Sequence, residues 1–397
     1  MRLQPTIDSK RSSTRQLLVD VSIIASHDAG TGIQRVVRSL LLQLLANPPA
    51  GFEIRPVQAT RKRRYRYADA YLYSLTSSAP EHGEDKVSVA NGDIFLGLDL
   101  ASRITPRRQL DLLRWRTKGV RCAFVVYDLL PILHPHWFTP RARRSFRHWL
   151  STLAVHADTL FCISNSVSSE AQSYMKQRFG LTTSDFSAHW FHLGADLPSS
   201  QALTPTTSSF SNDLCPASDC CTVLMVGTIE PRKGHAQVLD AFELLWAAGT
   251  NTTLVISGRQ GWQVNNLVER LTHHPEIGKR LHWFSGIADA QLARLYGELD
   301  GLIMASEAEG FGLPLVEAAQ YGMPIFARKL PVFREVASEH ATYFNAKTGA
   351  ELAPQLADWI GQLADGSAPR SDAILPLTWS ASAERLKALI ADLDRSS

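Results

Sequence analysis

Short apolar runs alternate along the chain with longer stretches in which apolar residues recur every three or four positions. The short runs are typical of buried β-strands, whereas the longer stretches have the spacing of amphipathic helices. In the first half, the pattern predicts strands over 17–22, 93–98, 122–127 and 159–164 and helices over 33–45, 141–155 and 167–177. In the second half, it predicts strands over 223–227, 254–257, 281–284, 302–304 and 324–327.

Three further helices are predicted in the second half from their apolar faces and end signals. Asp289 is placed as the N-cap of one of them. The stretch 377–393 has helical apolar spacing close to the end of the chain. The third helix follows Gly234 and carries a clean apolar stripe of Val238, Leu239, Phe242, Leu245 and Trp246.

The two halves are separated by residues 198–219, which are rich in Ser, Thr and Pro and lack periodicity, so a domain boundary is placed there. Strand–helix alternation on both sides predicts the α/β class with two doubly wound parallel sheets. In such sheets, ligands bind beyond the carboxyl ends of the strands. We therefore expect two Rossmann-like domains, at 1–197 and 220–376, that face each other across a ligand-binding cleft.

Length and composition agree with this division. A chain of 397 residues, 45% hydrophobic and 20% charged, suits a soluble protein of two domains. It has no apolar run of membrane-spanning length, and its first residues lack the apolar centre of a secretory signal. Five cysteines without metal-type spacing indicate a reducing compartment, so a cytoplasmic location is expected, with Cys220 and Cys221 as small core residues.

The net charge of +3 hides an asymmetry between the halves. Residues 1–199 carry 26 Lys and Arg against 16 Asp and Glu, a net charge of +10, whereas the rest carry 15 against 22, a net charge of −7. The first half is therefore expected to meet an anionic surface or an anionic lipid-linked substrate.

A dense basic run lies at 61–66, Arg61-Lys62-Arg63-Arg64-Tyr65-Arg66. Nucleic-acid binding, adsorption to anionic lipid and a solvated loop all fit such a run. Together with the charge of the first half, we favour peripheral association with an anionic membrane surface and expect no nucleic-acid partner.

The richest chemistry lies between Met304 and Pro324. Pro314 marks the start of a short helix and Gly322 its end, so Gly310-Phe311-Gly312 would present free backbone N–H groups at a helix N-terminus, which suits a phosphate. Glu309 and Glu317 bracket this loop. A carboxylate beside a phosphate is repulsive unless it faces hydroxyls, so the segment indicates a ligand that has both, namely a nucleotide sugar.

A second basic loop follows the strand that ends near Gly227. Gly227 allows close backbone approach, and Arg232 with Lys233 places two cations at a strand's carboxyl end, where a diphosphate needs neutralising. The alternative is a solvated basic pair ahead of a helix. The carboxylate-flanked loop makes that alternative the weaker one.

These segments together resemble a known family. Glu309-Gly310-Phe311-Gly312-Leu313-Pro314-Leu315-Val316-Glu317 resembles the glutamate–seven–glutamate motif of retaining GT-B glycosyltransferases, notably glycosyltransferase family 4. The resemblance covers roughly 222–340. Residues 258–262 and 331–336 are similar to a subgroup of bacterial mannosyl- and rhamnosyltransferases that build surface polysaccharides.

The resemblance implies roles for individual residues. Arg232 and Lys233 would bind the donor diphosphate. Glu309 would form hydrogen bonds with hydroxyls of the donor sugar, and Glu317 with the ribose hydroxyls of the nucleotide. The same resemblance places 1–197 as the acceptor domain and 220–376 as the donor domain, with 377–397 crossing back onto the acceptor domain. The remaining donor contacts would come from Gly227, the backbone N–H groups of Phe311, Gly312 and Leu313, the base-flanking Gly286 and Ile287, and the nearby Ser257 and Gly258.

The first half supplies fewer candidates. Gly30-Thr31-Gly32 resembles the family's glycine loop after the first strand, so Gly32 would face phosphate or acceptor, although a plain strand-to-helix turn explains the glycines equally well. Asp128 could position the acceptor hydroxyl or act as a base, and we favour it over His134 and His136. Asn165 and Ser166 fit either a family turn or a helix N-cap.

The implied reaction is transfer of a hexose from a nucleotide diphosphate to an acceptor hydroxyl with retention of configuration. GDP-mannose is the expected donor, ahead of GDP-rhamnose and UDP-hexoses, and the expected acceptor is a lipid-linked glycan or growing polysaccharide such as O-antigen. Arg232 and Lys233 would stabilise the negative charge of the leaving diphosphate without a metal or other cofactor. An epimerase or phosphorylase on the same architecture, a non-catalytic nucleotide-sugar sensor and a nucleic-acid binder remain as alternatives.

Overall fold

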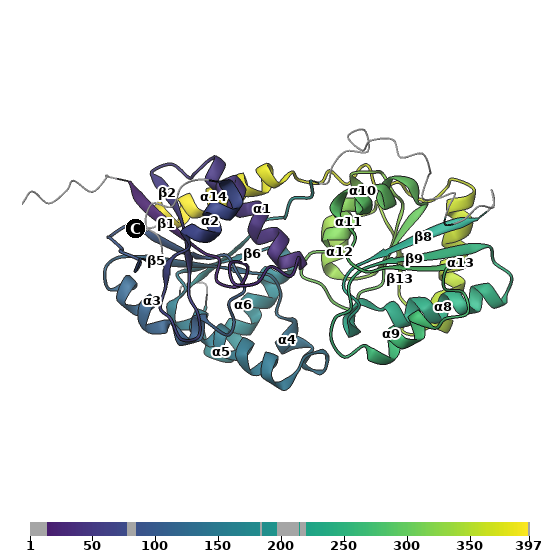
Figure 1. Cartoon of the computed structure of the whole chain (residues 1–397), viewed down its shortest axis with the longest axis horizontal. Helices are drawn as coiled ribbons and strands as arrows, with labels where there is room; N and C mark the ends of the chain where they lie inside the picture. Colours follow the sequence, from purple (N-terminus) through teal and green to yellow (C-terminus); the bar gives the residue numbers. More distant parts are fainter. Residues whose placement is uncertain (1–13, 78–84, 183–184, 197–213, 215–219, 396–397) are drawn as a thin grey trace, which may run out of the picture.

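Two parallel sheets, each flanked by helices, form the protein in a computed structural model that describes residues 14–77, 85–182, 185–196, 214 and 220–395 (Figure 1). The α/β class with two doubly wound sheets, expected from the alternation of strands and helices, is confirmed. The linker expected at 198–219 lies outside the described residues, apart from the buried Leu214.

The first sheet has the strand order β3-β2-β1-β4-β5-β6-β7, parallel except for the short edge strand β3, which runs antiparallel to β2. Its strands are β1 (Arg15–Asp20), β2 (Phe52–Gln58), β3 (Arg66–Tyr67), β4 (Ile94–Gly97), β5 (Arg121–Val126), β6 (Thr159–Cys162) and β7 (Ser187–Trp190). Its helices are α1 (Gly32–Ala46), α2 (Asp69–Thr76), the 3₁₀ turn η1 (Thr105–Arg107), α3 (Gln109–Arg116), α4 (Leu130–Leu133), η2 (Pro135–Trp137), α5 (Pro140–His156) and α6 (Asn165–Phe179).

The second sheet has the order β10-β9-β8-β11-β12-β13 and all its pairings are parallel. Its strands are β8 (Cys221–Val226), β9 (Thr252–Ser257), β10 (Leu281–Phe284), β11 (Gly301–Met304), β12 (Ile325–Arg328) and β13 (Thr342–Phe344). Its helices are η4 (Pro231–Lys233), α8 (His235–Ala247), α9 (Asn265–Thr272), α10 (Asp289–Glu298), α11 (Leu313–Ala319), α12 (Pro331–Ala337) and α13 (Gly349–Ala364).

The last helix, α14 (Trp379–Arg395), leaves the second sheet and packs beside α1 of the first (Figure 1). Arg15 at the start of β1 forms a bidentate ion pair with Asp394, with N–O distances of 2.5 and 2.7 Å. Leu386 and Ile390 of α14 are fully buried in the same core as β1. Both ends of the described chain are therefore tied to one domain.

Three local expectations were wrong. Asp289 is the first residue of helix α10 and Ala288, whose backbone is extended, is its N-cap; the N–H of Ala288 donates to the Gln291 side chain at 3.2 Å. The helix around Pro314 has this proline in its first turn as expected, but it ends at Ala319, before Gly322. Cys220 is disulfide-bonded rather than a free core residue, although Cys221 is free and buried in β8.

Candidate functional site

The loops that follow β8, β9 and β10 lie side by side at the carboxyl ends of their strands. The N–H of Gly227 donates to the carbonyl of Ser257 at 2.9 Å, and that of Gly258 donates to the carbonyl of Phe284 at 2.9 Å. Gly286 and Ile287 continue directly from the last of these strands. The parallel register therefore gathers the predicted donor contacts of this domain at one edge of its sheet.

Glu309 sits at the centre of a largely buried ion-pair cluster. Its carboxylate pairs with Arg232 at 2.8 Å and with Lys233, and it accepts a hydrogen bond from the Ser306 hydroxyl at 2.7 Å. Arg232 also pairs with Glu230 at 2.7 Å. Burial acts to raise the pKa of Glu309, but the charges of Arg232 and Lys233 outweigh it and lower that pKa to about 2. The three residues predicted to meet the sugar and the diphosphate are thus brought together.

Asp128 approaches the same cluster from the other domain. It follows β5, and its carboxylate accepts a hydrogen bond from the N–H of Leu130 at 3.0 Å. Desolvation raises the pKa of Asp128, and the charge of Arg232 opposes this rise. Because Arg232 belongs to the second domain, the Asp128 carboxylate interacts electrostatically with the Glu309 cluster across the domain boundary.

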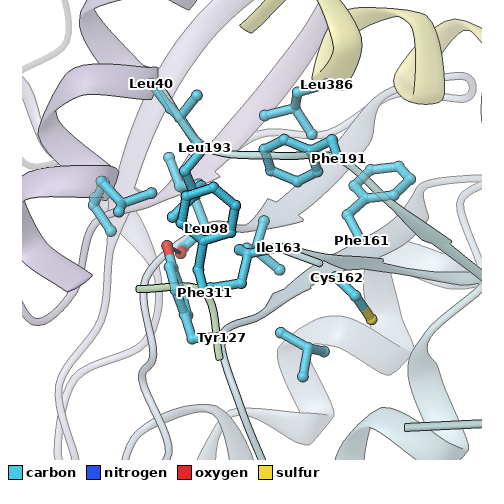
Figure 2. Close-up of a cluster of buried hydrophobic side chains, with 14 of the residues drawn as sticks. Leu40, Leu98, Tyr127, Phe161, Cys162, Ile163, Phe191, Leu193, Phe311 and Leu386 are labelled. Atoms are coloured by element: carbon cyan, nitrogen blue, oxygen red, sulfur yellow. Dashed lines mark hydrogen bonds between the residues drawn. The ribbon is translucent and has the colours of Figure 1, made fainter. Parts of the chain in front are cut away.

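The loop after Glu309 is inserted into the first domain. A Cβ on Gly310 would lie 1.9 Å from the carbonyl oxygen of Tyr127, so only glycine permits this approach. The Ser164 hydroxyl donates to the carbonyl of Gly310 at 2.8 Å. Figure 2 shows the ring of Phe311 among side chains of the first domain, close to Tyr127 and Ile163, and only 3% of Phe311 is exposed.

The N-terminal end of α11 begins directly after this insertion. Gly312 is its N-cap, with a φ of +95° that favours glycine, and it has no side-chain cap. In the described part of the chain, no acceptor bonds the N–H groups of Phe311, Gly312 and Leu313. These N–H groups therefore retain their donor capacity, as the sequence predicted for an anion-binding turn.

Glu317, the expected ribose ligand, is occupied by protein groups. Arg35 of α1 donates to its carboxylate at 2.6 Å and the Tyr296 hydroxyl donates at 2.9 Å. Burial raises the pKa of Glu317, while Arg35 lowers it. Sequence reasoning missed Arg35, although its place in the first turn of the helix after the glycine loop is a usable signal. A ribose that binds Glu317 would have to share or displace this partner.

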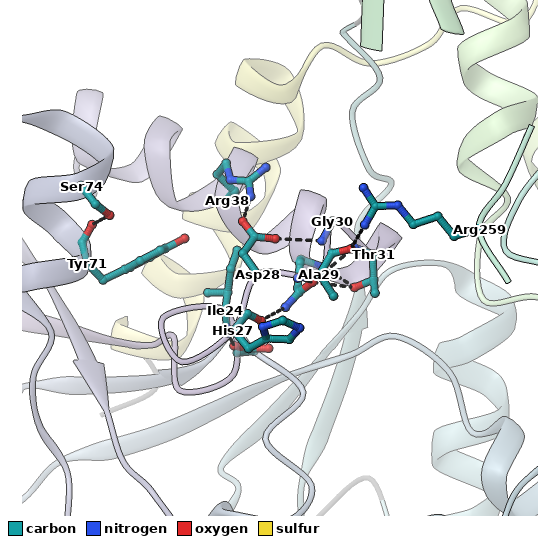
Figure 3. A network of polar contacts seen from close by, with 12 residues as sticks. Ile24, His27, Asp28, Ala29, Gly30, Thr31, Arg38, Tyr71, Ser74 and Arg259 are labelled. Atoms are coloured by element: carbon teal, nitrogen blue, oxygen red, sulfur yellow. Dashed lines mark hydrogen bonds and ion pairs between the residues drawn. The ribbon is translucent and has the colours of Figure 1, made fainter. Parts of the chain in front are cut away.

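The glycine loop of the first domain faces the second domain (Figure 3). Thr31 caps α1, and a Cβ on Gly32 would lie 3.9 Å from the side chain of Leu313, so the N-terminal ends of α1 and α11 oppose each other. Arg259 reaches over from the loop after β9 and donates to the carbonyl of Ala29 at 2.8 Å. Its guanidinium also passes close to Gly286, where a Cβ would lie 3.0 Å from Nε.

The remaining candidates of the first domain serve contacts inside the protein. His134 stacks on Trp137 with a centroid distance of 4.4 Å, and burial lowers the pKa of His134. The N–H groups of Asn165 and Ser166 donate at 2.7 and 2.9 Å to Glu335 of α12, so a carboxylate of the second domain caps α6 of the first. The N-cap residue of α6 is Ser164 rather than Asn165 or Ser166, and no local pattern indicated the contact with Glu335.

Glu170 on α6 was also missed. Burial and the nearby charge of Asp128 raise its pKa from 4.5 to about 7. Because its pKa is higher in the folded than in the unfolded protein, its contribution to stability is full below pH 4.5 and is lost as the pH rises through about 7.

We therefore expect Glu170→Gln to be more stable, relative to wild type, at pH 8.5 than at pH 5, by on the order of 1–2 kcal/mol. Urea unfolding at the two pH values measures the difference. Glu53→Gln, which changes a carboxylate of β2 in the same domain, is the control and should show little change. Equal wild-type and Glu170→Gln profiles would contradict the assignment.

Comparisons with known proteins agree with this geometry. The family model of glycosyl transferases group 1 matches residues 216–366. The serotype-specific mannosyltransferase WbdA of Escherichia coli is 42% identical over 389 residues, which cover 95% of this chain and 46% of the relative. An O-antigen chain mannosyltransferase B of Escherichia coli is 30% identical over 177 residues, 40% of this chain and 45% of the relative. The chain spans about half the length of the curated relatives it matches.

Solved structures share the fold at low identity. A sucrose-phosphate synthase of Thermosynechococcus elongatus superposes with a TM-score of 0.64 at 15% identity over 96% of this chain and 100% of that chain. HepE of Anabaena, solved with UDP and glucose, gives a TM-score of 0.63 at 15% identity over 94% of this chain and 99% of that chain. The chain therefore has two facing Rossmann-like sheets in the GT-B fold, and its segment 216–366 belongs to the glycosyl transferases group 1.

Proposed function

We propose that this chain is a retaining mannosyltransferase that moves mannose from GDP-mannose to a growing surface polysaccharide or lipid-linked glycan. The observation that carries the proposal is the buried cluster of Glu309 with Arg232 and Lys233, which lies against Asp128 of the other domain. The naming of its relatives as mannosyltransferases supports mannose as the sugar.

The charges of the cluster suit glycosyl transfer. As the bond between the sugar's anomeric carbon and the donor diphosphate breaks, positive charge develops on the ring and negative charge on the leaving group. Arg232 and Lys233 would stabilise the leaving diphosphate, and Glu309 would bond the sugar's hydroxyls. The acceptor oxygen attacks the anomeric carbon from the face that the diphosphate leaves, the leaving phosphate takes the acceptor proton, and configuration is retained. Asp128 would position the acceptor hydroxyl.

We further propose that no metal takes part, because two cations already stand where the diphosphate charge would develop. The chain's one Asp-x-Asp sequence, Asp392-Leu393-Asp394, lies on α14, where Asp394 is paired with Arg15. Transfer should therefore be unchanged after exhaustive treatment with EDTA, and restoration of activity by added Mg²⁺ or Mn²⁺ would contradict this expectation.

A donor panel tests the proposed activity. GDP-mannose should raise the melting temperature, because a ligand that binds only the folded state stabilises it, and the enzyme should transfer or slowly hydrolyse its mannose. GDP-rhamnose and UDP-hexoses are the alternative donors in the same assay. Binding of a donor without any turnover would identify a nucleotide-sugar sensor instead.

The domains are proposed to divide the substrates, with 1–197 binding the acceptor, 220–376 binding the donor and 377–397 returning to the first domain. The packing of α14 beside α1 supports the last assignment. Among the described residues, no helix combines the length and apolarity needed to cross a membrane.

We propose a cytoplasmic enzyme that adsorbs to the inner face of the membrane through Arg61–Arg66. Arg61, Lys62, Arg63 and Arg64 are all exposed, which supports this proposal. Neutralising the run should reduce sedimentation with anionic vesicles, and unchanged sedimentation would contradict the membrane role.

A further inference from the structure

Arg259 lies in the loop at the carboxyl end of β9, and its backbone is held by hydrogen bonds from neighbouring segments. The N–H of Ile229 donates to the carbonyl of Arg259 at 2.9 Å, and the N–H of Gly261 donates to the carbonyl of Ile229 at 2.9 Å. Trp283 of β10 fixes the preceding residue, because its indole N–H donates to the carbonyl of Gly258 at 2.8 Å. The Arg259 side chain therefore starts from a well-ordered backbone.

The guanidinium of Arg259 lies against the turn that follows β10. A Cβ on Gly286 would be 3.0 Å from its Nε and 3.6 Å from its Nη2. Its Nη1 donates to the carbonyl of Ala29 in the first domain at 2.8 Å (Figure 3). Within the described residues, no carboxylate lies within ion-pair distance of this guanidinium, and its other N–H groups have no acceptor. Because a guanidinium has five N–H donors, most of its capacity is unused.

The strand order indicates on which side of the diphosphate the base of the donor would lie. Arg232 and Lys233 follow β8, and Glu309 follows the neighbouring β11, so the diphosphate and the sugar would lie over these two strands. Glu317, the expected ribose ligand, is bonded by Tyr296 of α10, the helix that follows β10. The nucleoside would therefore extend from β8 over the ends of β9 and β10.

The turn after β10 leaves room for a base beside the Arg259 guanidinium. Gly286 and Ala288 are exposed, Ile287 is half-buried, and none of the three has a polar side chain. Nη1 of Arg259 is used by Ala29, whereas Nε and Nη2 are the atoms that lie near Gly286. Nε–H and the adjacent Nη2–H form one edge of the guanidinium, which can donate two parallel hydrogen bonds to a single partner.

We propose that Arg259 selects the base of the nucleotide sugar by donating hydrogen bonds to O6 and N7 of guanine. The proposal rests on the proposed function, because it assigns the donor base of the same enzyme to one side chain. Guanine presents these two acceptors side by side, and the planar edge of an arginine matches both. Adenine has an amino donor in place of O6, and uracil offers only O4 on the corresponding edge. Arg259 therefore favours GDP over ADP and UDP.

Binding of nucleoside diphosphates, measured by titration calorimetry without acceptor, tests this assignment. Wild type should bind GDP at least about tenfold more tightly than ADP or UDP, and at least about fivefold more tightly than 7-deaza-GDP, which lacks the N7 acceptor. Arg259→Met keeps an aliphatic stem without the donors, so it should bind GDP, 7-deaza-GDP and ADP within about twofold of one another. Gln260→Ala is the matched control, because Gln260 is exposed in the same loop and bonds Asn265 instead, and it should keep the wild-type preferences.

Several outcomes would overturn the assignment. A wild type that binds ADP, UDP or 7-deaza-GDP as tightly as GDP does not recognise the O6 and N7 edge, and this comparison requires no variant. An equal loss of affinity for every nucleotide in Arg259→Met would make Arg259 a contact between the domains only, and unchanged preferences would exclude it from base recognition. Because binding is measured without turnover, a wild type that selects GDP but transfers no mannose would refute the proposed function and leave the role of Arg259 standing.

Discussion

Replacing Lys233 by alanine should lower the rate of mannosyl transfer by about 10²–10³-fold, the usual cost of removing one preorganised charge at a reacting centre. The Lys233 side chain is only 13% exposed and is paired with Glu309, so its ammonium is already in place when the leaving diphosphate becomes charged. Water is a poor replacement for this charge in a largely desolvated position. Initial rates with saturating GDP-mannose and acceptor measure the effect.

The pairing with Glu309 adds a sharper expectation. Glu309→Gln should also be severely impaired, and the double variant Lys233→Ala/Glu309→Gln should lose much less than the product of the single losses, because the two groups act as a unit. Lys279→Ala changes an exposed lysine of the same domain and should leave turnover unchanged. Wild-type turnover in Lys233→Ala with an intact fold would show that Lys233 takes no part in the reaction. If the losses of the two single variants multiply fully in the double variant, Lys233 and Glu309 act independently.

The sequence alone predicted structural features correctly where a single segment contains the whole pattern that indicates the feature. The strands over 281–284 and 302–304 matched the structure to within one residue, because buried parallel strands read as continuous apolar runs. The loop at 310–312 was placed at a helix N-terminus from its glycines and Pro314 alone. Strand β13 escaped prediction because it has only three residues and becomes a strand through its pairing with β12.

Contacts between distant segments could not be predicted. Arg35 and Glu317 are 282 positions apart, and nothing near either residue indicates the other. The same holds for Glu335, which caps α6 across the domain boundary, and for Arg259, which bonds the glycine loop. These contacts depend on how the two domains dock, whereas local patterns determine only what each domain contains.

The loop that begins at Glu309 both joins the two domains and carries a carboxylate of the proposed reacting centre. Glu309 binds the cations of the donor side, Gly310 touches the carbonyl of Tyr127, and Phe311 is buried in the first domain. A displacement of the two domains would therefore move the carboxylate that the sugar is proposed to meet. The packing of Phe311 in the first domain thus contributes to the geometry of the reacting centre as well as to the free energy of unfolding.

Phe311→Ala should accordingly lower the free energy of unfolding by about 3–5 kcal/mol, the range for deleting a buried phenylalanine ring. Because the ring joins the two domains, we also expect thermal unfolding to separate into two transitions and hydrolysis of GDP-mannose to rise relative to transfer. Calorimetry and product analysis measure these effects.

Phe326→Ala provides the matched control, because Phe326 is buried inside the second domain and stacks on Trp359 at a centroid distance of 5.0 Å. It should cost similar stability without raising the ratio of hydrolysis to transfer. If Phe311→Ala behaves in the same way, the inserted ring stabilises the fold without fixing the relative position of the domains. A raised ratio in Phe311→Ala alone would show that cleft geometry depends on this one buried ring, because water then reaches an anomeric centre from which the closed domains exclude it.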